Sequence, residues 1–183
     1  MSYAAVLDAD VLHPHITVDL LLRLADRRLF RPLWSREILD EVHRSLVDRG
    51  FSDTAITRRI AMMEEAFPDA MVDWDTHFLS SVPPAVDPDD RHVVAAALAG
   101  RADAIVTRNL RHFPAADLFS VGLEVQDLDA FLVNQWTLDP QAVEDTFADM
   151  ESDRTKPPRT FPELLDALER HAPFFVHAVR QAT

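Results

Sequence analysis

The chain of 183 residues has no cysteine, three glycines and one lysine, Lys156. Without cysteine it can form neither disulfides nor thiolate-ligated metal sites. Its net charge of −13 disfavours nonspecific binding along nucleic acid, which depends on lysine and arginine. The remaining 17 of its 18 basic residues are arginines. Arginine suits bidentate phosphate contacts, although a GC-rich genome would produce the same excess.

Long apolar runs are also missing. No stretch approaches the roughly 20 residues of a membrane span, so we expect no membrane partner. The first apolar stretch is too short for a signal peptide, which predicts a cytoplasmic protein. The apolar content of 48% is typical of a globular fold and argues against disorder.

The most informative stretch begins at Tyr3 and ends at Leu12, and it contains Asp8 and Asp10. Its dense apolar residues predict a strand that is buried on both faces. Acids at the carboxyl end of such a strand lie where open α/β sheets bind ligands. Burying ionised acids is costly unless a metal cation compensates, so this stretch indicates a metal site.

Strands and helices alternate along the next hundred residues. The predicted helices cover residues 17–30, 35–49, 53–66 and 87–100. Further strands are predicted at residues 31–34, 70–74, 103–107 and 123–125, with a loop at 75–88. This alternation predicts an α/β three-layer sandwich, in which helices cover both faces of a parallel sheet of four or five strands.

The residues after Asp127 are predicted to be helical. Asp139-Pro140 begins one helix and Pro157-Pro158 breaks it, while Thr160 and Glu163 form a capping box for the last helix. This tail has too few apolar residues for its own core. We therefore expect a domain at residues 1–130 and a C-terminal helical extension at 131–183 that packs on it or on a partner chain.

Three acids from separate segments, Asp8, Glu41 and Asp90, are predicted to meet at one edge of the sheet. Such oxygen donors suit Mg²⁺ or Mn²⁺. Two carboxylates about 4 Å apart repel by roughly 4 kcal/mol at an effective dielectric near 20, so the cluster needs a cation or a proton. Taken singly, Asp90 could merely stabilise a helix N-terminus and Glu41 could be a solvated helix residue.

Four segments in this order resemble the PIN domain, the metal-dependent ribonuclease fold of VapC-type toxins. They are residues 6–12 (VLDADVL), 35–42 (SREILDEV), 87–97 (DPDDRHVVAAA) and 105–114 (IVTRNLRHFP). The resemblance covers residues 1 to about 130. It implies that Asp8, Glu41 and Asp90 bind the metal, with Glu37 as the rival of Glu41.

The fourth catalytic position of the family, an acid in many PIN domains, is Asn109 here. The amide can orient a ligand water but carries no charge, which leaves open whether one or two metals bind. Asp10 and Thr107 are expected in secondary roles near the metal. Arg108 and Arg111, which follow the fourth strand, are candidates for holding phosphates.

The resemblance implies an endoribonuclease that depends on Mg²⁺ or Mn²⁺ and leaves a 5′-phosphate and a 3′-hydroxyl. It further implies the toxin half of a toxin–antitoxin pair, with RNA as substrate, an antitoxin protein as partner and a homodimer as the assembly. An inert PIN-like binding module is an alternative that Asn109 favours.

A second alternative is a haloacid-dehalogenase-type phosphatase, because Asp8-Ala9-Asp10-Val11-Leu12 also resembles the opening of that family. That family needs a lysine upstream of its last acid pair, and Lys156 lies far downstream of Asp89-Asp90.

Histidine spacing alone would suggest zinc at His13 and His15, but exposed imidazoles in a turn are the favoured interpretation. His43 and His92 are expected to lie off the acidic face.

Overall fold

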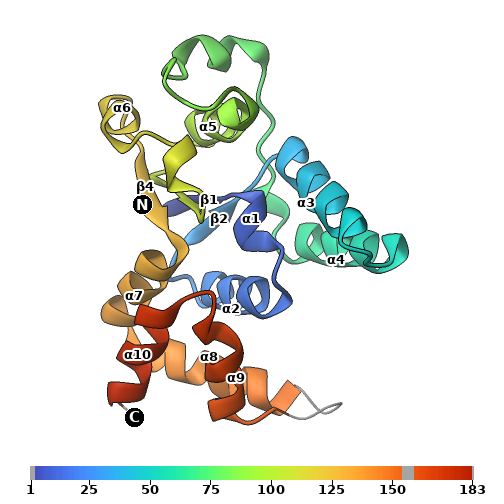
Figure 1. Ribbon diagram of the computed structural model, residues 1–183, viewed down its shortest axis with the longest axis vertical. Helices are drawn as coiled ribbons and strands as arrows, with labels where there is room; N and C mark the ends of the chain where they lie inside the picture. Colours follow the sequence, from blue (N-terminus) through green and yellow to red (C-terminus); the bar gives the residue numbers. More distant parts are fainter. Residues whose placement is uncertain (1–2, 154–158, 183) are drawn as a thin grey trace.

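The computed structural model describes residues 3–153 and 159–182, and its centre is a four-stranded sheet (Figure 1). All neighbouring strands are parallel, in the order β2-β1-β3-β4. The strands are β1 (Ala4–Leu7), β2 (Arg31–Leu33), β3 (Ala104–Thr107) and β4 (Glu124–Asp127). Every residue of β1 and β3 is buried, as expected of central strands covered on both faces.

Helices cover both faces of this sheet. Helix α5 (Arg91–Ala99) packs against β1 and β3 on one face. Helices α2 (His15–Asp26) and α7 (Leu128–Leu138) pack on the opposite face, as Figure 1 shows. The predicted α/β sandwich with a parallel sheet is therefore confirmed.

The first strand is shorter than predicted, because β1 ends at Leu7 and not at Leu12. The Asp8 carboxylate accepts a hydrogen bond from the Ala9 amide and caps a short helix, α1 (Ala9–Leu12). The stretch therefore turns immediately after its first acid. This turn keeps Asp10 near the end of the strand.

Residues 70–74 do not form the predicted strand. The 3₁₀ helix η1 (Pro68–Ala70) leads into a single parallel bridge between Trp34 and Met71. The neighbouring strand β2 has only three residues and includes Pro32, which has no amide hydrogen to donate. The edge therefore offers too few partners for a further strand, and the predicted loop contains the 3₁₀ helix η2 (Thr76–Ser81).

Two predicted helices have other bounds in the structure, and the helix predicted from residue 17 begins at His15. Helix α2 ends at Asp26, before residue 30, and Arg28 then adopts a positive φ of 63°. The segment predicted as one helix from Asp87 begins as the 3₁₀ helix η3 (Pro88–Asp90) and continues as α5.

Helices α3 (Arg36–Asp48) and α4 (Asp53–Ala66) form an arm beside the sheet (Figure 1). Ser35 caps α3 as predicted, since its hydroxyl accepts a hydrogen bond from the Ile38 amide. The stripe of Ile38, Val42 and Leu46 is buried, which places Glu41 on the flank of that stripe. Two short elements, η4 (Leu110–His112) and α6 (Ala115–Ser120), connect β3 to β4.

The C-terminal segment forms α8 (Pro140–Asp153), α9 (Phe161–Glu169) and α10 (Pro173–Ala182). Helices α8 and α9 contact α2, and α10 contacts α7 (Figure 1). The buried carboxylate of Asp129 on α7 accepts hydrogen bonds from the amides of Phe174 and Phe175, at 2.9 and 2.7 Å, which ties α10 to the sheet domain.

The capping box of Thr160 and Glu163 is present, but it begins α9, and the last helix is α10. The predicted break at Pro157-Pro158 lies outside the described residues. In residues 3–153 and 159–182, no helix has the length and apolar character needed to cross a membrane.

Candidate functional site

The candidate site is built around Asp8, which is only 4% exposed at the carboxyl end of β1. Its Oδ1 accepts a hydrogen bond from the Ala9 amide, and its Oδ2 accepts one from the Thr107 hydroxyl, each at 2.7 Å. Thr107 ends the neighbouring strand β3, so parallel pairing of β1 and β3 brings the two side chains together.

Burial, and to a lesser extent the nearby charge of Asp10, raise the pKa of Asp8 to about 7, although the hydrogen bonds from Thr107 and Ala9 act to lower it. The ionised carboxylate is therefore poorly stabilised by the protein alone at neutral pH. A positive charge beside it would remove this penalty.

Asp10 lies beside Asp8 and is held by the chain that follows β3. The Arg108 amide donates to both Asp10 oxygens, at 3.1 and 3.0 Å, and the Thr107 hydroxyl lies 3.4 Å from Oδ2. Burial raises the pKa of Asp10, the Arg108 amide opposes the shift, and the charge of Asp90 adds to it. Asp10 and Asp90 therefore lie close enough to influence each other.

Glu41 approaches this group from α3. Burial raises the pKa of Glu41, and the charges of Asp90 and Asp10 raise it as well, while His92 and Arg44 lower it. Glu41 and Asp90 also line one hollow of about 610 Å³. The other residues that line this hollow are Glu37, Asp40, Arg44, Trp74, Asp89 and His92.

Glu37, the rival of Glu41, has a different environment. Its Oε2 accepts a hydrogen bond from the Trp74 indole at 3.1 Å. Burial acts to raise the pKa of Glu37, but hydrogen bonds from its own amide, Ser35 and Trp74 outweigh burial and lower it. Hydrogen bonds from neutral donors thus stabilise Glu37 as a carboxylate, whereas the negative charges of nearby acids destabilise the carboxylate of Glu41.

His92 does not lie off the acidic face, as expected, but beside Glu41. Its Nδ1 donates to the Asp89 carbonyl at 2.9 Å, which directs Nε2 toward Glu41 Oε2 at 3.7 Å. That Nε2 is buried and has no hydrogen-bond partner among the described residues. The error arose because Asp90 precedes α5 in a 3₁₀ turn, so the first residues of α5 face the acids and not the opposite side.

Asp90 lies at the start of α5, where its Oδ2 is 2.7 Å from His112 Nδ1. Asp87 Oδ2 lies 3.9 Å from the same nitrogen. The ligand atoms of Asp87, Asp90 and His112 all lie within 4.8 Å of one another, a spacing that a single metal ion can bridge. Asp8 and Glu41 are not members of this tight group, although their charges act on each other.

Asn109 contacts this group through its side chain. Its Nδ2 lies 2.7 Å from His112 Nδ1, and its Oδ1 accepts a hydrogen bond from Arg111 Nε at 3.1 Å. His112 Nδ1 cannot both donate to Asp90 and accept from Asn109, because one ring nitrogen is either a donor or an acceptor. The arrangement therefore leaves one polar contact unsatisfied in either tautomer.

His112 and Asp87 are residues that sequence reasoning missed. Asp87 stands at the start of the helix predicted over residues 87–100, and it caps η3 by accepting a hydrogen bond from the Asp89 amide. The available signal for His112 was its spacing, since one 3₁₀ turn brings position 112 back beside Asn109.

The two arginine candidates differ in position. The Arg111 side chain donates a hydrogen bond to Asn109, whereas the Arg108 side chain is exposed and only its backbone amide binds Asp10.

His13 is half-buried rather than exposed, since it directly follows α1, and burial lowers its pKa to about 4. His43 lies 2.9 Å from Asp53, away from the acids.

Comparison with known proteins gives two family matches. Residues 4–111 match the model of the PIN domain, and residues 128–181 match the model of the VapC50 C-terminal domain. A Mycobacterium tuberculosis (strain ATCC 25618 / H37Rv) protein named "Putative ribonuclease VapC50" is 39% identical over 92 residues, which cover 50% of this chain. The match covers 54% of the relative, so the chain spans about half of its length.

No solved structure matches the chain at a significant level. The PIN-domain match nevertheless covers both central strands, the arm that carries Glu41 and the start of α5 that carries Asp90. The match also favours a PIN domain over the haloacid-dehalogenase-type phosphatase, because the resemblance to that phosphatase rested on the first motif alone. The chain therefore belongs to the PIN-domain family.

Proposed function

We propose that this protein is an endoribonuclease that hydrolyses RNA phosphodiester bonds with the help of Mg²⁺ or Mn²⁺. The observation that carries the proposal is the convergence of Asp8, Asp10, Glu41 and Asp90 around a nearly inaccessible Asp8, where the charges of neighbouring acids help to raise the pKa of Asp8, Asp10 and Glu41. Such a group is unfavourable without a compensating cation and favourable with one.

The donors suit a hard divalent ion, because they are carboxylate oxygens. Asp8, Glu41 and Asp90 would hold it, with Asp10 and Thr107 as secondary contributors. Asp87 and His112 beside Asp90 offer a second position. A bound ion would neutralise charge on the scissile phosphate and lower the pKa of a water molecule.

The residues of the chain would prepare this chemistry. The Thr107 hydroxyl and the Ala9 amide fix the two oxygens of Asp8, and the Arg108 amide fixes those of Asp10. Glu41, whose pKa is raised, would take a proton from the attacking water. Attack of this water on the phosphorus, with cleavage of the bond between phosphorus and the 3′ oxygen, would leave a 5′-phosphate and a 3′-hydroxyl.

We further propose that the protein is the toxin of a toxin–antitoxin pair, acts in the cytoplasm and forms a homodimer. The similarity to a protein named as a VapC ribonuclease supports this assignment. The hollow lined by Glu37, Asp40, Glu41, Asp89 and Asp90 suits a basic segment of an antitoxin, because complementary charge favours such an interface.

Incubation of the purified protein with total RNA, with Mn²⁺ or with a chelator, tests the proposal when new 5′ ends are sequenced. We expect cleavage that requires the ion and disappears in Asp90→Asn. Wild-type cleavage rates in that variant would contradict the assignment.

The inert binding module is the second candidate, and the neutral Asn109 at the fourth position favours it. A metal titration followed by thermal unfolding separates the two. An active enzyme should gain thermal stability with Mn²⁺, whereas an inert module should show no shift.

A further inference from the structure

A second group of charged side chains adjoins the acids, and these are arginines. Arg108 connects the two groups, since its amide binds Asp10, its side chain is exposed, and its charge acts on both Asp10 and His13. The positive charges of Arg49, Arg59 and Arg108 all help to lower the pKa of His13. Those of Arg108 and Arg170 help to lower the pKa of His171. Three arginines therefore lie near enough to His13 for their charges to act on it, and Arg108 and Arg170 lie equally near His171.

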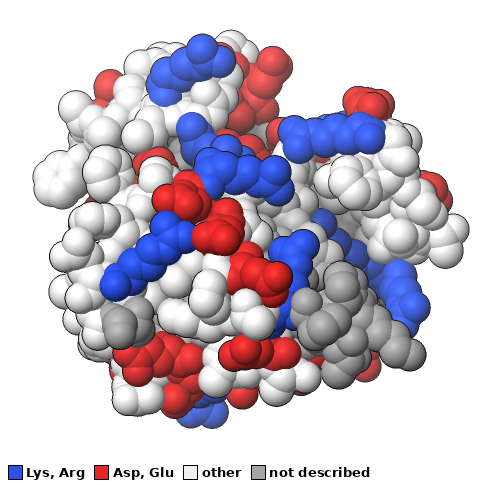
Figure 2. All heavy atoms as spheres, turned by 60° about the horizontal axis from the view of Figure 1, so that its bottom comes forward, with Lys and Arg blue, Asp and Glu red and all other residues white. Residues whose placement is uncertain are grey.

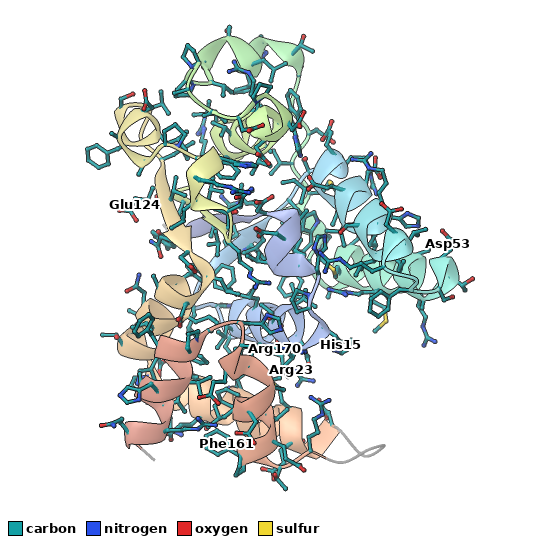
Figure 3. All side chains as sticks on the ribbon, in the orientation of Figure 1. His15, Arg23, Asp53, Glu124, Phe161 and Arg170 are labelled. Atoms are coloured by element: carbon teal, nitrogen blue, oxygen red, sulfur yellow. The ribbon has the colours of Figure 1, made fainter. Side chains whose placement is uncertain are left out.

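The position of each arginine follows from the fold. Arg59 on α4 donates hydrogen bonds to the carbonyls of Leu12 and His13, at the end of α1, and Arg49 follows α3 in the same arm. Arg170 lies in the corner between α9 and α10, beside α2 (Figure 3). The C-terminal extension thus reaches the end of the sheet that carries the acids.

The arginines of the described residues fall into two groups, those with an acidic partner and those without one. Arg23, Arg27, Arg36 and Arg180 each form an ion pair within 4.0 Å. Arg49, Arg59, Arg108 and Arg170 form none with the described residues, in a chain with 31 acids. Figure 2 shows arginine side chains around a hollow in the face that comes forward, beside a band of acids.

The two histidines add unsatisfied polar atoms. His13 Nε2 and His171 Nδ1 are buried, and neither has a hydrogen-bond partner among residues 3–153 and 159–182. His171 Nε2 accepts a hydrogen bond from Arg170 Nε at 3.0 Å, which leaves the terminal nitrogens of Arg170 available. Guanidinium groups without acidic partners, together with ring nitrogens without hydrogen-bond partners, are features of a site for a polar, anionic ligand.

We propose that Arg49, Arg59, Arg108 and Arg170 form a binding site for the backbone of single-stranded RNA, and that the C-terminal extension supplies Arg170 to it. The proposal deepens the nuclease function and rests on it. A strand with a phosphate at Asp8 and Asp90 carries one negative charge per nucleotide, and Arg108 gives it a continuous path away from the acids. Arginines that flank a groove bind such a backbone without reading its sequence.

The test measures binding and not cleavage. Fluorescence anisotropy in chelator follows the full-length protein with a labelled RNA of about ten nucleotides, over a range of salt concentrations. Arg170→Ala and Arg108→Ala should each weaken binding about tenfold and reduce the salt slope by about 0.7, the value expected for one phosphate contact. Arg170→Lys should keep the slope, because it keeps the charge.

Arg180→Ala is the matched control. Arg180 lies on α10 of the same extension but is paired with Asp166 and Glu169, so its loss should change neither affinity nor slope. Wild-type affinity and slope in Arg170→Ala would overturn the proposal. Equal binding of a glutamate decamer would overturn it too, because the cluster would then be a site for an acidic protein segment.

These results separate the proposal from the nuclease function. If arginine-dependent binding is seen but no cleavage occurs with Mg²⁺ or Mn²⁺, the binding site stands and the enzymatic function fails. If RNA is cleaved and Arg170→Ala binds as tightly as wild type, the function stands and the role of the extension fails.

Discussion

Asp8→Asn should stabilise the metal-free protein while abolishing cleavage. Asparagine is nearly isosteric with aspartate, and its amide oxygen can still accept the hydrogen bond of the Ala9 amide. Its amide nitrogen can donate to Thr107, whose hydroxyl is then free to donate to Asp10 Oδ2, 3.4 Å away. The substitution therefore removes a buried charge without leaving a buried polar group unpaired.

The size of the effect follows from the pKa of Asp8, which rises from its ordinary value of 3.8 to about 7. When the folded-state pKa of an acid is raised, stability falls as the pH rises from the unfolded value to the folded value, because only the unfolded chain loses its proton there. The difference corresponds to about 4 kcal/mol above pH 7 in the metal-free protein. Below the ordinary pKa both states are protonated, and the penalty vanishes.

Urea unfolding in chelator, at several pH values, measures this difference directly. The stability gain of Asp8→Asn should be near zero at about pH 4 and reach several kcal/mol at about pH 8. Asp26→Asn removes an exposed carboxylate of α2 and controls for net charge. A gain that does not change with pH, or a loss of stability at high pH, would refute the argument from burial. With Mn²⁺ present the order should reverse, because only the wild type gains from the ion.

The remaining predictions concern Asn109 and Asp129. Asn109→Asp places a further carboxylate beside Asp90 and His112 and should tighten Mg²⁺ binding about tenfold by calorimetry; unchanged or weaker affinity would mean that this position does not face the ion. Asp129→Ala leaves the amides of Phe174 and Phe175 without their acceptor and should cost about 1–3 kcal/mol in urea unfolding. Asp129→Asn, which keeps one acceptor oxygen, should lose less free energy of unfolding than Asp129→Ala. Equal stability of the wild type and both variants would show that these two hydrogen bonds do not stabilise the fold.

The sheet could be predicted because its strands have one property that sequence displays directly. The residues of β1 and β3 are buried on both faces, so their apolar runs are continuous. Residues 70–74, which were predicted as a strand, have a similar composition, but the neighbouring edge of the sheet offers too few backbone groups for continuous strand pairing. Composition shows that a segment can be buried, whereas strand pairing depends on the edge strand beside it. Here that edge strand is β2, which is short and includes Pro32.

The site was predictable to the extent that residues occur at the ends of strands. Asp8 directly follows β1 and Thr107 ends β3, and their proximity follows from parallel pairing of the two strands. Asp10 also follows from the first motif, once Asp8 is seen to cap a turn. His92 and His112 were not predictable in this way, because their positions depend on the 3₁₀ turns η3 and η4, which rotate the chain by an amount that helical spacing does not give.

The net charge of −13 opposes the approach of RNA to the molecule as a whole. Charges separated by more than about 8 Å are largely screened at physiological ionic strength, so the local arrangement decides the interaction. Residues 113–183 hold 13 acids and 5 bases and so carry 8 of the 13 surplus negative charges. Among these acids, Asp145, Asp149 and Asp153 are paired with the arginines at the C-terminal end of α2, Arg23 and Arg27. Arg108 and Arg170, by contrast, form no ion pair with the described residues, and they stand at the mouth of the RNA site that we propose. A phosphate chain that approaches this mouth therefore meets arginines first, and it reaches the acids only where a divalent ion can reverse their charge.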